Sequence, residues 1–517
     1  MIFVVDFGSQ TTHLLGRRIR ELGVDTKIVQ PDEILRYAQN DKDIKGVILS
    51  GGPSSVYSKG APTIDPQIFD LKIPILGICY GLQLTTYLLG GKVVAGRKEY
   101  GPAKLKIENL KLKITNGLQE TFVVWMSHGD EVVALPEGFK TLGSTGHVPF
   151  AFVEDSKRKI IGLQFHPEVE HTENGLRILK NFIVICQGSH PAQSEGSRDS
   201  SAIPQNDIIE NIKTIVGDSY VIGAVSGGVD STVAATLTAK AIGKRFIPIH
   251  VDNGLMREGT REHVVGIFKK IGARPIVVNA VGEMLKRLRK VTDSEKKRKI
   301  IGNFYIEIFE RIRKKLLKKS LPVKFLLQGT IYSDVIESQG SKYASRIKSH
   351  HNVGGLPKNM KLKLLEPLRN FYKDEVREIG RRLDIDEDLV NRQPFPGPGY
   401  AVRIRGEVTK KRLEQEKKAD EVVIHELEKA GILDNVFLSF PVMTGAYSTA
   451  VKGDGRHFGE VVALRVVQSK DIMTSTWAKL PYEVLQKISS RIVNEIPGIS
   501  RVVYDITTKP PATMEWE

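Results

Sequence analysis

Cysteine is scarce in this chain. The 517 residues include two cysteines, Cys79 and Cys186, which are too few for a disulfide framework and favour a reducing compartment. No apolar run approaches the ~20 residues that a membrane-spanning helix needs, and no basic region precedes the first apolar residues. We therefore expect a cytoplasmic protein that does not enter membranes.

Acidic residues are outnumbered by basic ones. The chain has 60 Asp and Glu against 76 Lys and Arg, a formal net charge of +16. This excess suits a nucleic-acid binder, but it suits equally an enzyme that handles nucleotide phosphates. Much of it lies between Lys286 and Lys319, where basic residues alternate with apolar ones as on a solvated helix face. We favour an exposed helix and predict no nucleic-acid partner.

The length predicts about three domains. Residues 1–190 and 208–392 alternate apolar strands with amphipathic segments, which predicts two α/β domains with mostly parallel sheets. Residues 191–207 are rich in Ser, Gln and Pro and are predicted to be a linker. Residues 393–517 open with a Pro/Gly-rich stretch and then mix strands with helices. We expect a smaller α+β domain there.

A candidate nucleophile lies between a strand and a helix. Cys79 follows the apolar run Ile73–Ile78 and precedes Gly81, so the thiol is expected at a sharp turn near helix-end amides. His166 and Glu168 are two positions apart in a segment predicted to be extended, so Glu168 can orient the imidazole that deprotonates Cys79. A buried structural thiol is the alternative, and Cys186 at the end of an apolar helix fits that description.

Three segments of the amino-terminal part, residues 77–83, 125–130 and 165–168, resemble the class I glutamine amidotransferases. These enzymes hydrolyse the side-chain amide of glutamine to ammonia through a thioester. The resemblance implies that Cys79, His166 and Glu168 are catalytic. It also implies that Gly52 and Tyr80 line the oxyanion hole and that Gln83 helps to hold glutamine.

A second candidate site follows the strand predicted at residues 220–225. The turn comprises Ser226, Gly227, Gly228, Val229, Asp230 and Ser231 and leads into a helix, whose free amides and dipole attract phosphate. The hydroxyls of the two serines add donors, and Asp230 can bind Mg²⁺. A plain tight turn would need the glycines but neither the serines nor the aspartate. No Walker loop occurs in the sequence.

This turn is similar to the pyrophosphate loop of ATP pyrophosphatases. With residues 251–254, 327–337, 350–357 and 509–517, essentially the whole chain resembles the glutamine-hydrolysing GMP synthase family. The resemblance implies ATP-dependent adenylation of XMP, attack by ammonia to give GMP, and a homodimer formed by residues 393–517. It assigns residues to the adenylation centre (Asp334, Glu337), a lid (Lys348, His350, His351), a coupling helix (Lys373, Asp374, Glu375) and XMP (Arg298, Arg501, Lys509, Thr513, Glu515).

Other functions fit less of the chain. CTP synthase needs a Walker loop, asparagine synthetase needs a cysteine where this chain has Ile2, and NAD synthetase has a different glutaminase. A tRNA-modifying protein would explain the positive charge, but many thiolating relatives need cysteines beyond Cys186. Relatives commonly carry Gln or Met where this chain has Lys452, which leaves the purine contacts at that position open.

Overall fold

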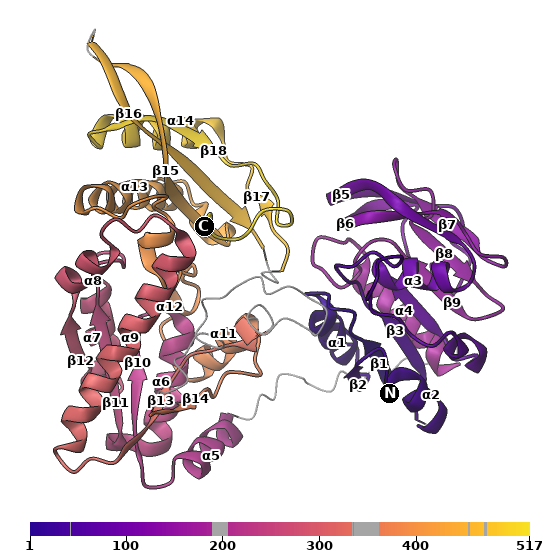
Figure 1. Cartoon of the computed structure of the whole chain (residues 1–517), viewed down its shortest axis with the longest axis horizontal. Helices are drawn as coiled ribbons and strands as arrows, with labels where there is room; N and C mark the ends of the chain where they lie inside the picture. Colours follow the sequence, from indigo (N-terminus) through magenta and orange to yellow (C-terminus); the bar gives the residue numbers. More distant parts are fainter. Residues whose placement is uncertain (42, 189–204, 333, 336–360, 453–454, 470–472) are drawn as a thin grey trace.

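The computed structural model describes residues 1–41, 43–188, 205–332, 334–335, 361–452, 455–469 and 473–517. Figure 1 shows the amino-terminal domain beside a stacked pair formed by the second and carboxyl-terminal domains. The part of the chain that the structure describes contains no helix with the length and hydropathy needed to cross a bilayer.

The amino-terminal domain is built on a nine-stranded sheet with the order β2-β1-β3-β4-β9-β8-β7-β5-β6. Its strands are β1 (Ile2–Val5), β2 (Thr26–Val29), β3 (Gly46–Leu49), β4 (Ile75–Ile78), β5 (Lys92–Ile107), β6 (Thr121–Ala134), β7 (Lys140–Ser144), β8 (Phe152–Asp155) and β9 (Ile160–Leu163). Its helices are α1 (Thr12–Glu21), α2 (Ile34–Asn40), α3 (Tyr80–Leu88) and α4 (Gly175–Gln187). Strands β1, β3, β4 and β9 are buried along their whole length, as expected for parallel strands covered on both faces.

The expectation of a mostly parallel sheet holds for half of this domain. The five strands from β2 to β9 pair in parallel, whereas β8, β7, β5 and β6 pair antiparallel. Strand β6 alternates in burial, because antiparallel strands joined by short turns leave one face without helices.

The second domain has a five-stranded parallel sheet with the order β12-β11-β10-β13-β14. Its strands are β10 (Tyr220–Ala224), β11 (Phe246–Asp252), β12 (Ile276–Asn279), β13 (Val323–Leu327) and β14 (Lys363–Leu365). Its helices are α5 (Gln205–Val216), α6 (Val229–Ile242), α7 (Thr260–Lys270), α8 (Val281–Leu288), α9 (Ser294–Leu317), α11 (Lys373–Arg382) and α12 (Glu387–Val390). Residues 205–207, assigned to the linker from the sequence, form the start of α5 instead.

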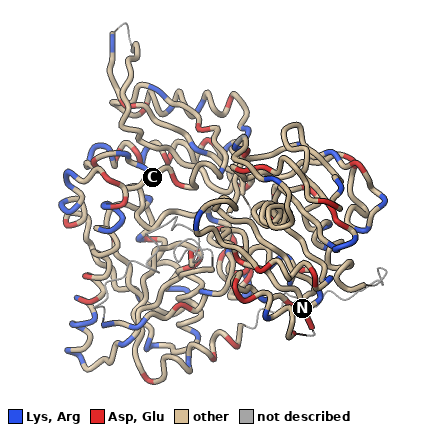
Figure 2. The backbone as a smooth tube through the Cα atoms, turned by 45° about the vertical axis from the view of Figure 1, so that its right-hand side comes forward, with Lys and Arg blue, Asp and Glu red and all other residues tan. Residues whose placement is uncertain are grey.

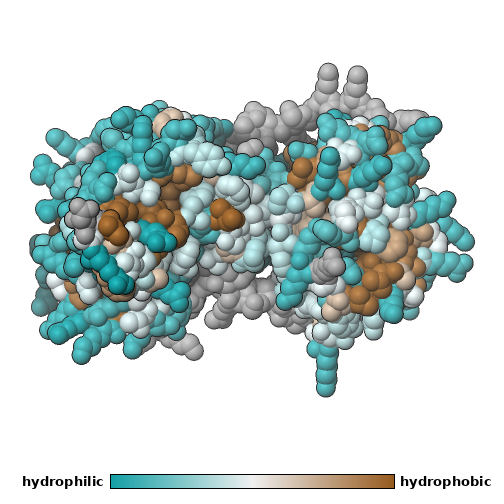
Figure 3. All heavy atoms as spheres, turned by 90° about the horizontal axis from the view of Figure 1, so that it is seen from above, coloured by the Kyte–Doolittle hydropathy of each residue, from teal (hydrophilic) through white to brown (hydrophobic). Residues whose placement is uncertain are grey.

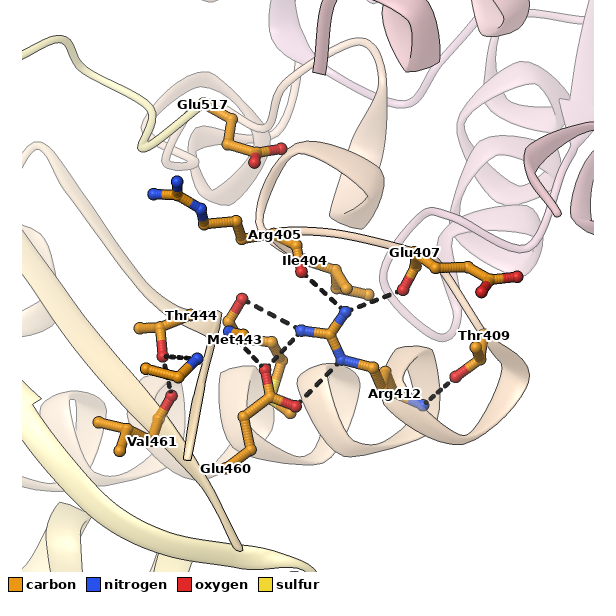
Figure 4. Close-up of polar contacts among 12 residues, drawn as sticks. Ile404, Arg405, Glu407, Thr409, Arg412, Met443, Thr444, Glu460, Val461 and Glu517 are labelled. Carbon is orange, nitrogen blue, oxygen red and sulfur yellow. Dashed lines mark hydrogen bonds and ion pairs between the residues drawn. The ribbon is translucent and has the colours of Figure 1, made fainter. Parts of the chain in front are cut away.

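The carboxyl-terminal domain packs two helices, α13 (Lys410–Lys429) and α14 (Tyr482–Glu495), against a sheet. The sheet comprises β15 (Leu438–Lys452), β16 (Gly455–Gln468), β17 (Thr476–Trp477) and β18 (Ile499–Tyr504). In Figure 4 the Arg412 guanidinium on α13 binds the Glu460 carboxylate on β16 and two loop carbonyls. One hydrophobic cluster runs from β10 and β11 through α9 to β16 and α14, so the second and third domains share a core.

The amino-terminal domain meets this pair through α1. Arg17 on α1 binds both carboxylate oxygens of Asp374 on α11, and its Nη1 lies 2.9 Å from Oδ1. Figure 1 shows α1 facing α11 across the space between the bodies. The helix that the sequence associated with coupling therefore contacts the amino-terminal domain directly.

Candidate active site

Cys79 occupies the sharp turn that the sequence predicted. Strand β4 ends at Ile78, α3 begins at Tyr80, and Cys79 between them has φ +50° and ψ −104°. A non-glycine residue rarely adopts this backbone, and such strain is typical of nucleophile turns. A Cβ on Gly81 would lie 2.2 Å from the Leu49 carbonyl oxygen, so the turn requires glycine there. The turn holds the thiol at the carboxyl end of the sheet.

The predicted general base, His166, forms a buried pair with Glu168. His166 Nδ1 lies 2.8 Å from Glu168 Oε1, and both side chains are almost completely buried. Burial lowers the pKa of His166, but the Glu168 charge and hydrogen bonds with Cys79 and Glu168 outweigh it and raise this pKa well above its ordinary value. The expected pairing is present, although a turn at Pro167 and not an extended strand brings the two side chains together.

The predicted oxyanion and glutamine residues lie on segments next to the Cys79 turn, with Tyr80 and Gln83 on α3 and Gly52 packed against Tyr80. A Cβ on Gly51 would lie 3.0 Å from His166 Cε1, and one on Gly52 would lie 3.2 Å from Tyr80 Cγ, so this loop packs on both side chains. Tyr80 donates its hydroxyl to Pro62 O at 2.6 Å. Gln83 Nε2 donates to Asp130 O at 2.8 Å and so links α3 to β6.

Glu99 is a nearby acidic residue that the sequence reasoning missed. Glu99 on β5 and His128 on β6 are paired in register, and Glu99 Oε2 lies 3.4 Å from His128 Nε2. Burial lowers the pKa of His128. Cys79 Sγ donates to the neighbouring Ser127 O at 3.5 Å, so this pair adjoins the nucleophile. Residues 125–130, which contain His128, carry a recognisable sequence motif. Glu99 carries none, because only the pairing of β5 with β6 brings it next to His128.

The second site forms at the carboxyl end of β10. Ser226 Oγ lies 3.1 Å from Ser231 Oγ and accepts from the Gly228 amide at 3.4 Å. Gly227 has φ +85°, a conformation that favours glycine. A Cβ on Gly329, in the segment after β13, would lie 2.8 Å from the Ser231 amide nitrogen. Two separated motifs therefore meet around one loop at the amino end of α6.

The carboxyl-terminal tail brings several predicted residues together. Arg403 Nε and Nη2 donate to the two Glu515 carboxylate oxygens at 3.1 and 3.2 Å, and Arg298 donates to the Glu517 carbonyl. Thr513 Oγ1 donates to the Glu515 carbonyl. Arg501 is instead exposed on β18, in register with Val461.

The expectation of an exposed basic helix holds for Lys296, Lys299, Lys314 and Lys315, which are exposed, but it is wrong at Lys297. Lys297 is fully buried, and its Nζ donates to Ala401 O at 3.0 Å and Ile404 O at 2.5 Å. Burial lowers the pKa of Lys297, while the Glu517 carboxylate acts in the opposite direction. The face of α9 that packs on the third domain is therefore not a solvated surface.

Family models match the amino-terminal domain and most of the carboxyl-terminal domain. The family "Glutamine amidotransferase class-I" matches residues 3–186, and "GMP synthase C terminal domain" matches residues 425–516. The chain is 49% identical over 518 residues to a glutamine-hydrolysing GMP synthase of Aquifex aeolicus, covering 100% of this chain and 99% of that protein. The chain belongs to the glutamine-hydrolysing GMP synthase family. Similar relatives with this name occur in Brachyspira hyodysenteriae (47% identical, 100% and 99% covered) and Saccharomyces cerevisiae (47%, 100% and 98%).

Asp230, the predicted Mg²⁺ ligand of the second site, is paired with a lysine. Both of its oxygens accept from Lys373 Nζ on α11, at 2.8 and 2.7 Å. Asp334 Oδ2 accepts from the Ile331 amide at 3.1 Å. The described residues contain no group of three or more His, Cys, Asp or Glu side chains arranged for a metal. The predicted Glu337, Lys348, His350 and His351 lie outside the described residues.

A cavity of about 1570 Å³ lies between the three domains and is lined by residues of each. The amino-terminal domain contributes Glu170 and His171, the second domain Arg257 and Arg377, and the third Asp420. Figure 2 shows Lys and Arg interspersed with Asp and Glu over all three domains. The lining residues Glu170, Arg257, Arg377 and Asp420 give the walls of the cavity both signs of charge.

Proposed function

We propose that this protein synthesises GMP from XMP, glutamine and ATP. Cys79 converts glutamine to glutamate and ammonia, and the second site transfers AMP from ATP to the XMP C2 oxygen with release of pyrophosphate. Ammonia then displaces AMP to give GMP. The observation that carries this proposal is full-length identity of 49% to a named GMP synthase, together with a Cys-His-Glu site and a phosphate loop in one chain.

In the glutaminase step, the Cys79 thiolate attacks the glutamine amide carbon and ammonia leaves with a proton from His166. Water then attacks the thioester, with His166 accepting its proton. Glu168 keeps the imidazolium in place through the buried 2.8 Å contact. The Gly52 and Tyr80 backbone amides would stabilise the oxyanion.

In the adenylation step, the amides and hydroxyls of Ser226–Ser231 would bind the pyrophosphate portion of ATP. Asp230 suits Mg²⁺, because this ion is usually held by one or two carboxylates together with substrate phosphates. Asp334, which follows the Gly329 segment that packs on the loop, would be a second carboxylate for the same centre. When bound, Mg²⁺ neutralises charge on the departing pyrophosphate. In this structure both Asp230 oxygens accept from the Lys373 ammonium.

XMP would bind at the carboxyl-terminal tail. Glu515 is held by Arg403 and can accept from purine N–H groups, while the cations of Arg298 and Lys509 suit the XMP phosphate. Thr513 adjoins Glu515 through its hydroxyl. Arg501 lies on β18, and its part in XMP binding rests on the resemblance alone.

A homodimer would form through the β15–β16 hairpin, which extends away from the body in Figure 1. Val451 and Phe458 near its tip are 77% and 73% exposed, and Tyr447 stacks on Phe458 with ring centroids 5.6 Å apart. Figure 3, seen from above, shows apolar side chains on the face of this domain. Exposed aromatic and aliphatic side chains on a projecting hairpin are typical of a protein interface.

Both cysteines are free thiols, which supports the cytoplasmic location we propose.

The test compares Cys79→Ala with the unchanged protein in two assays of GMP formation. With glutamine as nitrogen donor, the variant should form no measurable GMP, because the thioester cannot form. With an ammonium salt, its rate should stay within about twofold, because Cys79 and the Ser226–Ser231 loop lie in separate domains. Cys186→Ala is the matched control and should keep both activities. Equal loss with both donors would contradict the two-site proposal.

A further inference from the structure

The segment Met473–Ser475 touches the amino-terminal domain beside its catalytic base. Met473 is 6% exposed and packs in one hydrophobic cluster with Leu14, Trp125 and Val169. Val169 directly follows the catalytic Glu168. A residue of the carboxyl-terminal domain therefore completes a small core underneath the glutaminase site.

A polar contact reinforces this packing. Thr474 Oγ1 lies 2.8 Å from His171 Nδ1, and the His171 ring lies 4.8 Å from the Trp125 ring. His171 belongs to the same turn as Glu168. The contact thus combines a side-chain hydrogen bond with apolar burial at one point of the domain interface.

Trp125 and Thr172 hold the backbone of His166. Trp125 O accepts from the His166 amide at 3.1 Å, and Thr172 Oγ1 donates to His166 O at 2.6 Å while accepting from the Trp125 amide at 3.0 Å. Because protein interiors are close-packed, movement at Trp125 is passed to His166. A misplacement of about 1 Å in a catalytic group can cost about 10²-fold in rate.

The other side of the segment pairs with the carboxyl-terminal tail. The Ser475 amide donates to Lys509 O at 2.9 Å, and the Lys509 amide donates to Ser475 O at 2.8 Å. Lys509 is 7% exposed, so its backbone is firmly enclosed. Close by, a Cβ on Gly101 of β5 would lie 3.9 Å from Thr508 Oγ1, which brings the glutaminase domain against the same tail.

We propose that Met473, Thr474 and Ser475 form a coupling segment through which XMP at the tail sets the position of His166. The inference rests on the proposed function, since it takes Lys509 and Glu515 as XMP-binding residues. XMP bound at the tail acts on Ser475 through its two backbone hydrogen bonds with Lys509, and Met473 and Thr474 pass the effect to Trp125 and His171. Met473 and Thr474 act as positioning residues and do not touch the reacting atoms. Glutamine and XMP therefore bind with positive cooperativity.

The decisive experiment measures binding and not turnover. In a Cys79→Ala background, glutamine binds without being hydrolysed, so the XMP dissociation constant can be measured by calorimetry with and without saturating glutamine. We expect glutamine to tighten XMP binding by a factor in the range of about 5–150 that is typical of coupled sites, and XMP to tighten glutamine binding equally. Adding Met473→Ala or Thr474→Val should bring this factor close to one. Met473→Leu and Thr474→Ser, which keep the apolar volume and the hydroxyl, should retain it.

A kinetic readout separates coupling from general damage. With Cys79 present, XMP should raise kcat for glutamine hydrolysis in the unchanged protein and in Met473→Leu, but not in Met473→Ala or Thr474→Val. GMP formation from an ammonium salt should stay within about twofold in all four variants, because none of them alters the adenylation loop. Undiminished coupling in both Met473→Ala and Thr474→Val would overturn the inference. Failure of XMP to bind the Cys79→Ala protein at all would instead overturn the proposed function and remove the basis of this inference.

Discussion

Replacing Glu168 by Gln should disable the glutaminase while leaving the synthetase intact. The change removes a charge that lies 2.8 Å from His166 Nδ1 and is nearly inaccessible to solvent. At that separation, Coulomb's law with an effective dielectric constant of about 20 gives a ceiling of about 6 kcal/mol for the charge interaction. We expect kcat for glutamine hydrolysis to fall by about 10³- to 10⁴-fold, equivalent to about 4 to 5.5 kcal/mol and within that ceiling.

The pH profile provides a second, independent readout of Glu168→Gln. Glu168 raises the pKa of His166, so its removal lowers that pKa. The imidazolium that protonates the departing ammonia is then lost at lower pH. The alkaline limb of the kcat profile for glutamine hydrolysis should therefore move to lower pH.

The assay follows glutamate release across pH, with ammonia-dependent GMP formation as the internal reference. Glu170→Gln makes the same chemical change at a half-exposed carboxylate two positions away and should stay within about twofold. Thermal denaturation checks folding, because Glu168 Oε2 is buried without a hydrogen-bond partner among the described residues and an amide there costs about 1–3 kcal/mol. A well-folded Glu168→Gln protein with near-normal kcat and an unmoved alkaline limb would refute this account of the base.

Three further predictions concern the other domains. Asp230→Ala should abolish XMP-dependent pyrophosphate release with either nitrogen donor. The control Asp386→Ala, which breaks a surface ion pair with Lys270, should leave this release unchanged. Near-normal release by Asp230→Ala would exclude Asp230 from the metal centre. Glu416 is fully buried, and burial raises its pKa well above the ordinary value, so the folded state keeps a proton that the unfolded state releases above about pH 4.3. Stability should fall as pH rises from there, and Glu416→Gln should raise Tm more at pH 8 than at pH 5; a pH-independent difference would contradict this. Phe458→Asp should convert a dimer to a monomer in light scattering, while Leu317→Asp, at an exposed apolar residue on α9, should not; a dimer that survives Phe458→Asp would remove the hairpin from the interface.

The sequence alone identified features in which neighbouring residues determine the geometry. The turn at Cys79 follows from a buried strand, a helix start and the small residue Gly81, all contiguous in the chain. The loop at Ser226–Ser231 and the pairing of His166 with Glu168 are equally local, and the structure has all three. Helix and strand positions in the second domain were predictable for the same reason, because their apolar periodicity is a local property.

The tertiary structure decided which distant residues meet. Lys297 has the local pattern of an exposed helix residue, yet the carbonyls of Ala401 and Ile404 bury it where α9 meets the third domain. Lys373 meets Asp230, and Met473 completes the core around Trp125, although each pair is far apart in the chain. Periodicity specifies which face of an element is apolar, but it does not specify the partner that covers that face. That choice depends on the packing of whole domains, because burial and charge are satisfied by whichever groups the completed fold brings within contact distance.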